Sequence, residues 1–268
     1  MEQFRTARYN GPHPLTGRTE TNMKLVLLGT SGYHPNDRRH TACLMLPELG
    51  VVFDAGSAMY RVSDHLATNT LDVFLSHAHL DHVFGLTYMF DIIPVGPLKR
   101  VTVHGEPDKL QAVREHLFSE HLFPVDPPFE MKPLTADITL LDGSKLTHFP
   151  LKHPGGSIGY RIDWPDRSLA YITDTVAAKD VSYLEHVRGV DLLVHECFFC
   201  DDQPKQAELT GHSCLTQVVE LAAAAKVKKL VLVHINPVYN DDDCYDLDAA
   251  RKIFPATILG TDGMVVDF

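Results

Sequence analysis

Short apolar runs, each closed by glycine, proline or polar residues, recur along the chain from Met23 onward. Runs rich in Val, Ile, Leu and Phe predict buried β-strands. They lie at residues 24–28, 41–46, 51–53, 72–75, 101–104, 138–141, 146–149, 168–172, 192–196 and 229–233, with a strand-like tail over 258–268. Apolar residues spaced three or four apart predict helices over 57–68, 108–118 and 215–225.

The predicted elements form two halves, each with strands followed by helices, and no linker separates them. A chain of 268 residues fits one large α/β domain, which we place at residues 23–268. Residues 1–22 combine prolines, glycines and many polar residues without a core-forming pattern, so they predict an extended N-terminal arm.

Residues 76–82 carry the strongest chemical signal. They read Ser-His-Ala-His-Leu-Asp-His after an apolar run, so they form a loop at a predicted strand end. In extended backbone, residues two apart point the same way, so His77 and His79 can bind one ion together. Asp81 and His82 can reach a second position beside it. Imidazole with carboxylate suits zinc, and also iron or manganese. A solvated histidine-rich loop is the alternative, which this ordered set of four disfavours.

Further candidate ligands stand at the ends of other predicted strands. His153 leaves a strand end into a glycine-rich turn and is the natural third ligand for the first ion. Asp174 follows the strand over 168–172, where its two oxygens can each bind one cation. His234 ends the strand over 229–233 and repeats this placement.

Other polar residues near strand ends carry weaker signals. Asp54 can orient a metal-bound histidine from behind or cap the following turn, and the sequence leaves both readings open. Glu196 ends a buried strand and is predicted to support the ligands, whereas His195 is predicted to be a core residue. His212 precedes a predicted helix that Ser213 can cap, a place that favours an anion.

Composition and charge limit the kinds of substrate and partner that we expect. The net charge is −11 at pH 7 and the basic residues are dispersed, so a long nucleic acid is not the expected partner. Bound metal ions would offset the acidity locally, so a small anionic substrate fits. No apolar run approaches the roughly 20 residues of a membrane helix. No signal peptide pattern is visible either, so we expect a cytoplasmic protein without a membrane partner. A homodimer is compatible with the sequence.

The five cysteines are few, odd in number and scattered, which is not a disulfide framework. Cys197 and Cys200 form a single C-x-x-C pair, a weak zinc or redox signal without a second pair. We predict that these two are buried or half-buried thiols.

The order H-x-H-x-D-H after a buried strand resembles the metallo-β-lactamase superfamily. Segments of the second half resemble its ribonuclease Z group, which also contains small-molecule phosphodiesterases. These segments are residues 153–162, 173–175, 195–196, 211–213 and 231–234. The resemblance implies an α/β fold arranged as a four-layer αββα sandwich, with the metals between the two sheets.

Carried over residue by residue, the resemblance implies two divalent ions, with Zn²⁺ foremost and Mn or Fe as alternatives. The implied ligands are His77, His79 and His153 for one ion and Asp81, His82 and His234 for the other, with Asp174 bridging. His212 matches a histidine that contacts phosphate or assists the leaving group in the phosphodiesterase members. The mechanism we expect is attack by a metal-bridging hydroxide, with Asp81 holding its proton and His212 protonating the leaving oxygen.

One departure from the resemblance bears on the substrate. The tRNA-processing members carry a long flexible arm in the second half, but here residues 163–167 alone separate two predicted strands. The sequence therefore predicts a phosphodiesterase acting on a small cyclic or nucleotide-like phosphodiester. The alternatives are a lactonase, thioesterase or sulfatase, a tRNA 3′ processing endonuclease, and a non-catalytic binding module. His212 in its Gly-His-Ser setting argues against the first alternative, and the missing arm argues against the second.

Overall fold

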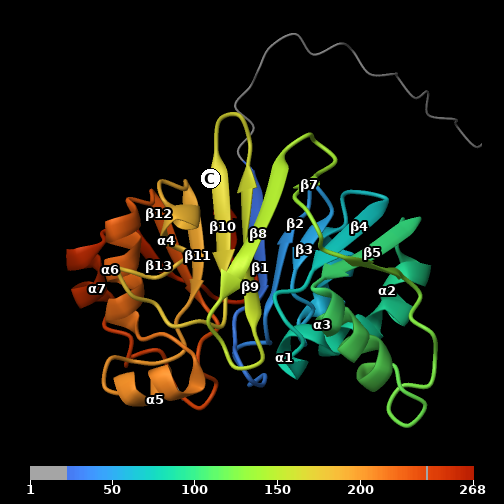
Figure 1. Cartoon of the computed structure of the whole chain (residues 1–268), viewed down its shortest axis with the longest axis horizontal. Coiled ribbons are helices and arrows are strands. Elements are labelled where there is room, and N and C mark those ends of the chain that lie inside the picture. The colour runs from blue at the N-terminus through green and yellow to red at the C-terminus, as the bar shows by residue number, and fades with distance from the viewer. Residues whose placement is uncertain (1–22, 240) are drawn as a thin grey trace, which may run out of the picture.

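The computed structural model describes residues 23–239 and 241–268, so the predicted N-terminal arm over 1–22 lies outside the described residues. Two seven-stranded sheets face each other at the centre, and helices cover the outer face of each sheet (Figure 1). This arrangement is a four-layer αββα sandwich, which confirms the predicted fold class.

The first sheet collects the strands of the N-terminal half and one strand from the C-terminal end. Its order is β14 (Val265–Asp267), β1 (Lys24–Gly29), β2 (Cys43–Leu46), β3 (Val51–Phe53), β4 (Thr70–Phe74), β5 (Arg100–Gly105) and β6 (Glu130–Pro133). Strands β3 to β6 run parallel to one another. The second sheet has the order β13 (Thr257–Leu259), β12 (Lys229–Val233), β11 (Leu192–Glu196), β10 (Ser168–Ile172), β9 (Ser157–Asp163), β8 (Lys145–Leu151) and β7 (Ile138–Thr139). Strands β10 to β13 are parallel. The predicted tail over 258–268 therefore divides between the two sheets.

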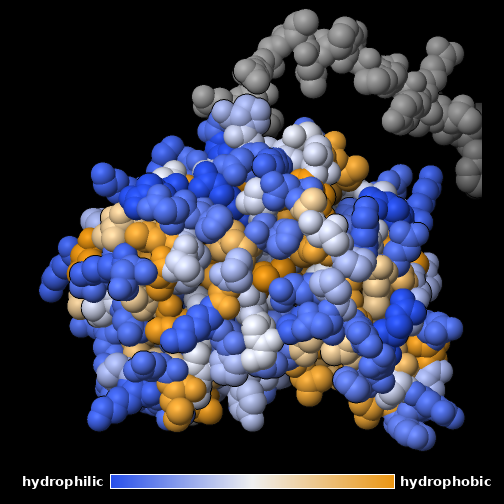
Figure 2. Space-filling view, in the orientation of Figure 1, coloured by the Kyte–Doolittle hydropathy of each residue, from blue (hydrophilic) through white to orange (hydrophobic). Residues whose placement is uncertain are grey.

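Helices and turns form the outer layers. Over the first sheet they are η1 (Met59–His65), α1 (Leu80–Val83), η2 (Phe84–Tyr88), α2 (Met89–Val95), α3 (Pro107–Ala112) and η3 (Val113–Leu117). In the second half they are α4 (Leu184–Val187), α5 (Pro204–Thr210), α6 (Leu215–Ala225) and α7 (Leu247–Ile253). None of the helices in the described part of the chain has the length and apolarity needed to cross a membrane. On the face drawn in Figure 2, hydrophilic residues predominate and apolar residues gather in smaller groups, some of them at the lower end.

Strand residues alternate between two cores. In β1, Leu25 and Leu27 face the other sheet, whereas Val26 and Leu28 face the helices that cover the first sheet. Successive side chains of a strand point to opposite faces, so a strand buried on both faces must be apolar throughout. This double burial explains why the strands appear in the sequence as unbroken apolar runs.

Two of the predicted helices differ in detail from the structure. The helix expected over 57–68 is a shorter 3₁₀ helix, and the one over 108–118 is divided between α3 and a π turn. Helix α6 has the predicted ends, but its N-cap is Cys214, so the prediction for Ser213 is wrong. The Ser213 hydroxyl instead donates to the Thr175 carbonyl and accepts from the Ala177 N–H, which ties this loop to the second sheet.

The prediction that the C-x-x-C cysteines are thiols is wrong for Cys200. Cys200 and Cys244 form a disulfide across 44 residues of sequence. The loop after β11 packs there against the segment before α7, where the Tyr245 hydroxyl donates to the Phe198 carbonyl at 2.9 Å. The other three cysteines are buried thiols: Cys43, Cys197 and Cys214. The C-x-x-C pair therefore does not act as a unit.

Candidate active site

The candidate site lies where parallel strands of both sheets end. The carboxyl ends of β3 and β4 in the first sheet meet those of β10, β11 and β12 in the second. Loops that leave this edge bring polar side chains from both halves together, as is usual for ligand sites in parallel sheets. In Figure 1 the edge is the lower end of the molecule, between α1 and α5.

Asp174 stands between two groups of side chains. Its Oδ2 lies 3.7 Å from Nε2 of His77 and 3.6 Å from Nε2 of His153. Its Oδ1 lies 3.2 Å from Nε2 of His82 and 3.3 Å from Nε2 of His234. One carboxylate oxygen therefore faces each group.

The first group contains His77, His79, His153 and Asp174, whose donor atoms lie within 4.8 Å of one another. Two ligand atoms bound to a tetrahedral ion at about 2.0–2.1 Å are about 3.3 Å apart, so the group is the size of one ion site. Burial is the main cause that lowers the pKa of all three imidazoles, which favours their neutral, ligand form. Nε2 of His77 is buried without a hydrogen-bond partner, and a bound cation would satisfy it.

The second group contains Asp81, His82 and His234. Oδ2 of Asp81 lies 3.4 Å from Nε2 of His82 and 3.3 Å from Nε2 of His234. The main-chain N–H of Tyr33 donates to the same oxygen at 2.7 Å. Burial opposes a charge on His82, but the carboxylates around it, Asp174 first, outweigh burial and raise the pKa of His82 well above its ordinary value. The second position therefore favours positive charge, as a cation site must.

Three residues of the site have left-handed backbone, which is uncommon outside glycine. The φ angles are 57° at Asp54, 48° at Asp174 and 56° at His234. Asp54 and His234 directly follow a strand and Asp174 lies two residues after one, and such a conformation costs about 1–3 kcal/mol. The turn ends the strand abruptly and leaves the side chain at the sheet edge where the ligands gather.

Asp54 contacts His82 on the side of the imidazole away from Asp174. This position agrees with the interpretation that Asp54 orients a histidine of the site. Nδ1 of His82 donates to its Oδ2 at 2.9 Å. The Ser76 N–H donates to Oδ1 at 2.7 Å, and the Ser76 hydroxyl donates to Oδ2 at 2.9 Å. The Tyr171 hydroxyl also donates to Oδ2, at 2.8 Å. Ser76 lies 2.9 Å from Nδ1 of His77 as well, so one cluster supports ligands of both groups. Sequence reasoning did not identify the parts played by Ser76 and Tyr171.

Glu196 is fully buried and holds His212. Its Oε1 accepts from Nδ1 of His212 at 3.0 Å and from the Thr175 N–H at 3.0 Å. Its Oε2 accepts from the N–H groups of Phe198 and Ser213. Burial opposes the charge on His212, but Glu196 outweighs it and the pKa of His212 rises to about 9. The Phe198 ring stacks on the imidazole, with ring centroids 4.7 Å apart. His212 is therefore oriented by Glu196 and keeps Nε2 for other contacts.

A cavity of about 500 Å³ opens onto both groups. The residues that line it are Tyr33, His79, Leu80, Asp81, His153, Pro154, Thr210 and His212. A donor atom of His212 lies within 4.8 Å of Asp174 and His234. The structure thus brings all seven predicted ligand residues together, with His212 beside them and Asp54 and Glu196 behind them.

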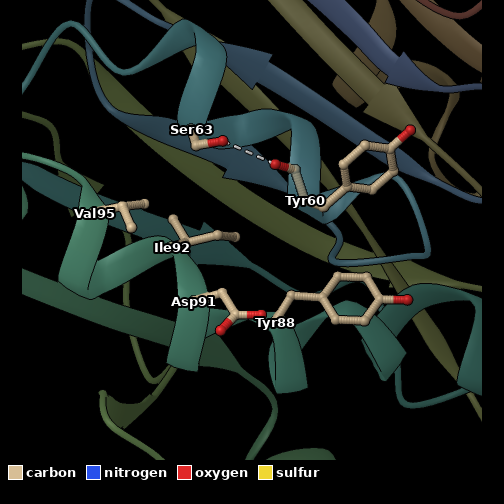
Figure 3. A pocket seen from close by; sticks show the side chains of 6 residues that line it. All are labelled: Tyr60, Ser63, Tyr88, Asp91, Ile92 and Val95. Carbon is tan, nitrogen blue, oxygen red and sulfur yellow. Dashed lines mark hydrogen bonds between the residues drawn. The ribbon is translucent and has the colours of Figure 1, made fainter.

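Other predicted positions lie away from the site. His195 is buried and contacts the Tyr183 hydroxyl at 2.9 Å, as expected of a core residue. The proline-rich segment over 123–133 contributes β6 and borders a different surface pocket. A further pocket, between η1 and α2, has no histidine or cysteine among the lining residues that the structure describes. Its lining residues, drawn in Figure 3, are Tyr60, Ser63, Tyr88, Asp91, Ile92 and Val95.

An αββα sandwich with grouped histidines and aspartates at its sheet edge defines a metal-dependent hydrolase of the metallo-β-lactamase type. The family model described as a beta-lactamase superfamily domain matches residues 51–235. The chain belongs to this family.

A curated relative and several solved structures are similar to the chain over most of its length. Ribonuclease BN of Escherichia coli (strain K12) is 29% identical, over 90% of this chain and 98% of the relative. The metallo-beta-lactamase fold protein YhfI of Bacillus subtilis superposes with a TM-score of 0.75 at 20% identity, over 92% of this chain and 100% of that one. A diphosphatase from the PhnP family superposes with a TM-score of 0.70 at 22% identity, over 92% of this chain and 98% of that one.

Proposed function

We propose that this protein hydrolyses a small phosphodiester with two divalent ions, Zn²⁺ foremost, held in the two groups around Asp174. Histidine and carboxylate ligands without a thiolate suit zinc, and manganese or iron fit the same set. When bound, such ions lower the pKa of water and neutralise charge that develops on the reacting group. The position of Asp174, with one oxygen toward each group, supports two ions rather than one.

The observation that carries the proposal is the orientation of His212. Glu196 engages Nδ1, so the imidazole can present Nε2 to the cavity that contains the two groups. A phosphodiester has a poor leaving group that needs a proton as its bond to phosphorus breaks. Protonated His212 is suited to supply that proton, a contribution worth about 10²–10⁴-fold. A thioester expels a thiolate, which leaves readily without a proton, so a thioester hydrolase has less need of such a donor.

Asp81 is placed to manage the proton of the attacking water. Its Oδ2 faces His82 and His234 and accepts from the Tyr33 N–H. Its Oδ1 accepts no hydrogen bond from the residues that the structure describes, so it remains available as a proton acceptor. Asp81 therefore combines ligand and base in one carboxylate.

The cavity supports a small anionic substrate. Its volume of about 500 Å³ is in the range of small-molecule sites. Within the described chain no lysine or arginine lines it, although proteins that bind long nucleic acids depend on such residues. Strands β9 and β10 are joined by residues 164–167 alone.

A ribonuclease is the second candidate, because ribonuclease BN is related over almost its whole length. That alignment spans 305 positions, whereas 90% of 268 residues is about 240, so roughly 60 aligned positions have no counterpart in this chain. The missing positions and the short β9–β10 connection both argue against a separate RNA-binding segment.

A substrate panel tests the proposal. Protein loaded with zinc or manganese is assayed with bis(p-nitrophenyl) phosphate, a γ-lactone, a thioester, an aryl sulfate and a precursor tRNA. We expect kcat/KM for the phosphodiester to exceed that for each carboxyl or sulfate ester by at least about 100-fold, because the two ion positions are proposed to match the charge of a phosphoryl group in its transition state. Preferred turnover of a lactone or thioester would overturn the proposal, and accurate cleavage of precursor tRNA would favour the second candidate.

A further inference from the structure

Tyr33 combines a fixed main chain with an exposed side chain at the rim of the site. Its N–H donates to Oδ2 of Asp81 at 2.7 Å. Its ring is 73% exposed, and its φ of 61° lies in the left-handed region. A bulky residue is uncommon in this conformation, which clusters at functional sites. The backbone therefore fixes where the side chain leaves the main chain, and the ring itself has an edge contact with His34, with ring centroids 5.3 Å apart.

Gly32, which precedes Tyr33, explains how this turn packs so closely against His234. A Cβ on Gly32 would lie 2.3–2.7 Å from ring atoms of His234, so only glycine fits there. Gly32 thus lies against one residue of the second group, and Tyr33 is bonded to another. The turn consequently places the Tyr33 side chain directly beside the second group.

The surroundings of the Tyr33 ring are apolar and open. Tyr33, Leu80 and Asp81 line both the cavity of about 500 Å³ and an adjoining one of about 140 Å³. Leu80 is 69% exposed and Phe84, in the smaller cavity, is 47% exposed. Three large apolar side chains exposed side by side mark a binding surface rather than a structural one. Neither cavity has a lysine or arginine among its described lining residues.

We infer that Tyr33 is a stacking platform for an aromatic ring on the ester group that stays attached to phosphorus, with Leu80 and Phe84 continuing the apolar wall. This inference rests on the proposed phosphodiesterase function of the same site. His212 serves the leaving oxygen in that function, so the retained group is the one free to extend toward Tyr33. The substrate class is thus a phosphodiester that carries an aryl or nucleobase group, not one with two short alkyl groups.

Binding of non-hydrolysable anions tests the platform independently of turnover. Isothermal titration of the metal-loaded protein compares phenylphosphonate with methylphosphonate. We expect the wild type to bind the phenyl compound about tenfold more tightly, the scale of one aromatic contact with its buried area. Tyr33→Ala should remove this preference and Tyr33→Phe should keep it. Tyr60→Ala, which removes another exposed tyrosine from the pocket of Figure 3, should also keep it.

Turnover supplies the second measurement. Bis(p-nitrophenyl) phosphate and methyl p-nitrophenyl phosphate share a leaving group but differ in the retained group. Tyr33→Ala should raise KM about fivefold to tenfold for the first substrate, leave the second within about twofold, and change kcat little. An equal effect on both substrates, an unchanged phenyl preference, or loss of metal from Tyr33→Ala would overturn the inference.

The two measurements separate this inference from the proposed function. If the wild type hydrolyses neither diester, but Tyr33→Ala removes the preference for phenylphosphonate, the phosphodiesterase function is refuted and the stacking platform is supported. If the wild type hydrolyses both diesters and Tyr33→Ala has the same KM values and the same phenyl preference, the phosphodiesterase function is supported and the stacking platform is refuted.

Discussion

Nδ1 of His82 lies 2.9 Å from Oδ2 of Asp54, and both side chains are fully buried. This contact fixes the plane of the imidazole and directs Nε2 toward Asp174. Histidines that bind metals commonly donate their other ring N–H to a carboxylate, which orients the ring and raises its basicity. Asp54 directly follows β3 and His82 lies in α1, which follows β4, so the pair stands at the ends of two neighbouring parallel strands.

Replacing Asp54 by alanine should weaken metal binding about 10-fold to 100-fold, because His82 and Ser76 lose the carboxylate that orients them. Competition with a chromophoric chelator measures the change. The matched control is Asp72→Ala, which breaks a similar contact, 2.8 Å between Asp72 and His104, away from the site. Equal metal affinity in the two variants would contradict the prediction.

Asp174→Ala should lose both ions, because each ion position loses one carboxylate oxygen and the three histidines of the first group keep no carboxylate among them. Elemental analysis after dialysis measures the metal content. Asp191→Ala is the control: Asp191 accepts from the Ser168 N–H at 2.8 Å in the same sheet and is not part of either group. A variant that keeps one ion would show that Asp174 serves a single site.

His212→Ala should keep both ions and lose turnover of phosphodiesters by about 10²–10⁴-fold, because the leaving oxygen departs without a proton. The loss should be larger for diphenyl phosphate than for bis(p-nitrophenyl) phosphate, since phenolate is the more basic leaving group. Parental turnover of both substrates would exclude this role for His212. Loss of metal would instead make His212 a ligand, which its distance of under 4.8 Å from Asp174 and His234 also allows.

The ligand residues could be listed from the sequence because a buried strand must end at a sheet edge. A polar residue within two positions of the end of such a strand, such as Asp174 or His234, is confined to that edge, and parallel strands place their carboxyl ends together. The apolar runs were predictable for the same reason, since strands buried on both faces leave no polar positions inside. Helix α6 has the predicted ends because its periodicity is regular.

Contacts between distant segments were not predictable. The Tyr171 hydroxyl reaches Asp54 across 117 positions of sequence, and a buried tyrosine in a strand gives no sign of its partner. The bond from Tyr33 to Asp81 uses a main-chain donor that every residue except proline possesses. The Cys200–Cys244 disulfide and the crossing of β14 to the first sheet likewise depend on how distant segments pack.

Metal removal should destabilise the fold, because each group joins residues of the first sheet, such as His77 and His82, to residues of the second, such as His153 and His234. An ion present at 100 times its Kd stabilises the folded state by about 2.7 kcal/mol. For a chain of this size, one such ion raises Tm by about 5–10 °C. Differential scanning calorimetry before and after EDTA treatment, and after zinc is restored, measures the shift. An unchanged Tm would mean that the sheets dock equally well without ions.

Asp72 predicts a pH-dependent contribution to stability. Burial opposes its charge, but the hydrogen bond from His104 and the charge of Arg100 outweigh burial and lower the pKa of Asp72. A lowered folded pKa gives stability above the unfolded value of about 3.9, which is lost as pH falls through the folded value. Asp72→Asn should therefore lower Tm at pH 7, and the gap from the parent should narrow toward pH 3. Both proteins are measured without metal, so that acid release of ions does not contribute. A gap as wide at pH 3 as at pH 7 would contradict this account.

The contact between Tyr33 and Asp81 uses the main-chain N–H, so the identity of the side chain at position 33 is irrelevant to the hydrogen bond itself. A substitution there changes what the rim presents to the substrate and leaves the donor to Asp81 in place, provided that the new residue is not proline. Substitutions at position 33 can therefore change substrate preference while the hydrogen bond to Asp81, and with it the hydrolytic site, is retained. Related proteins that act on different esters are expected to vary at this position while they keep the glycine before it.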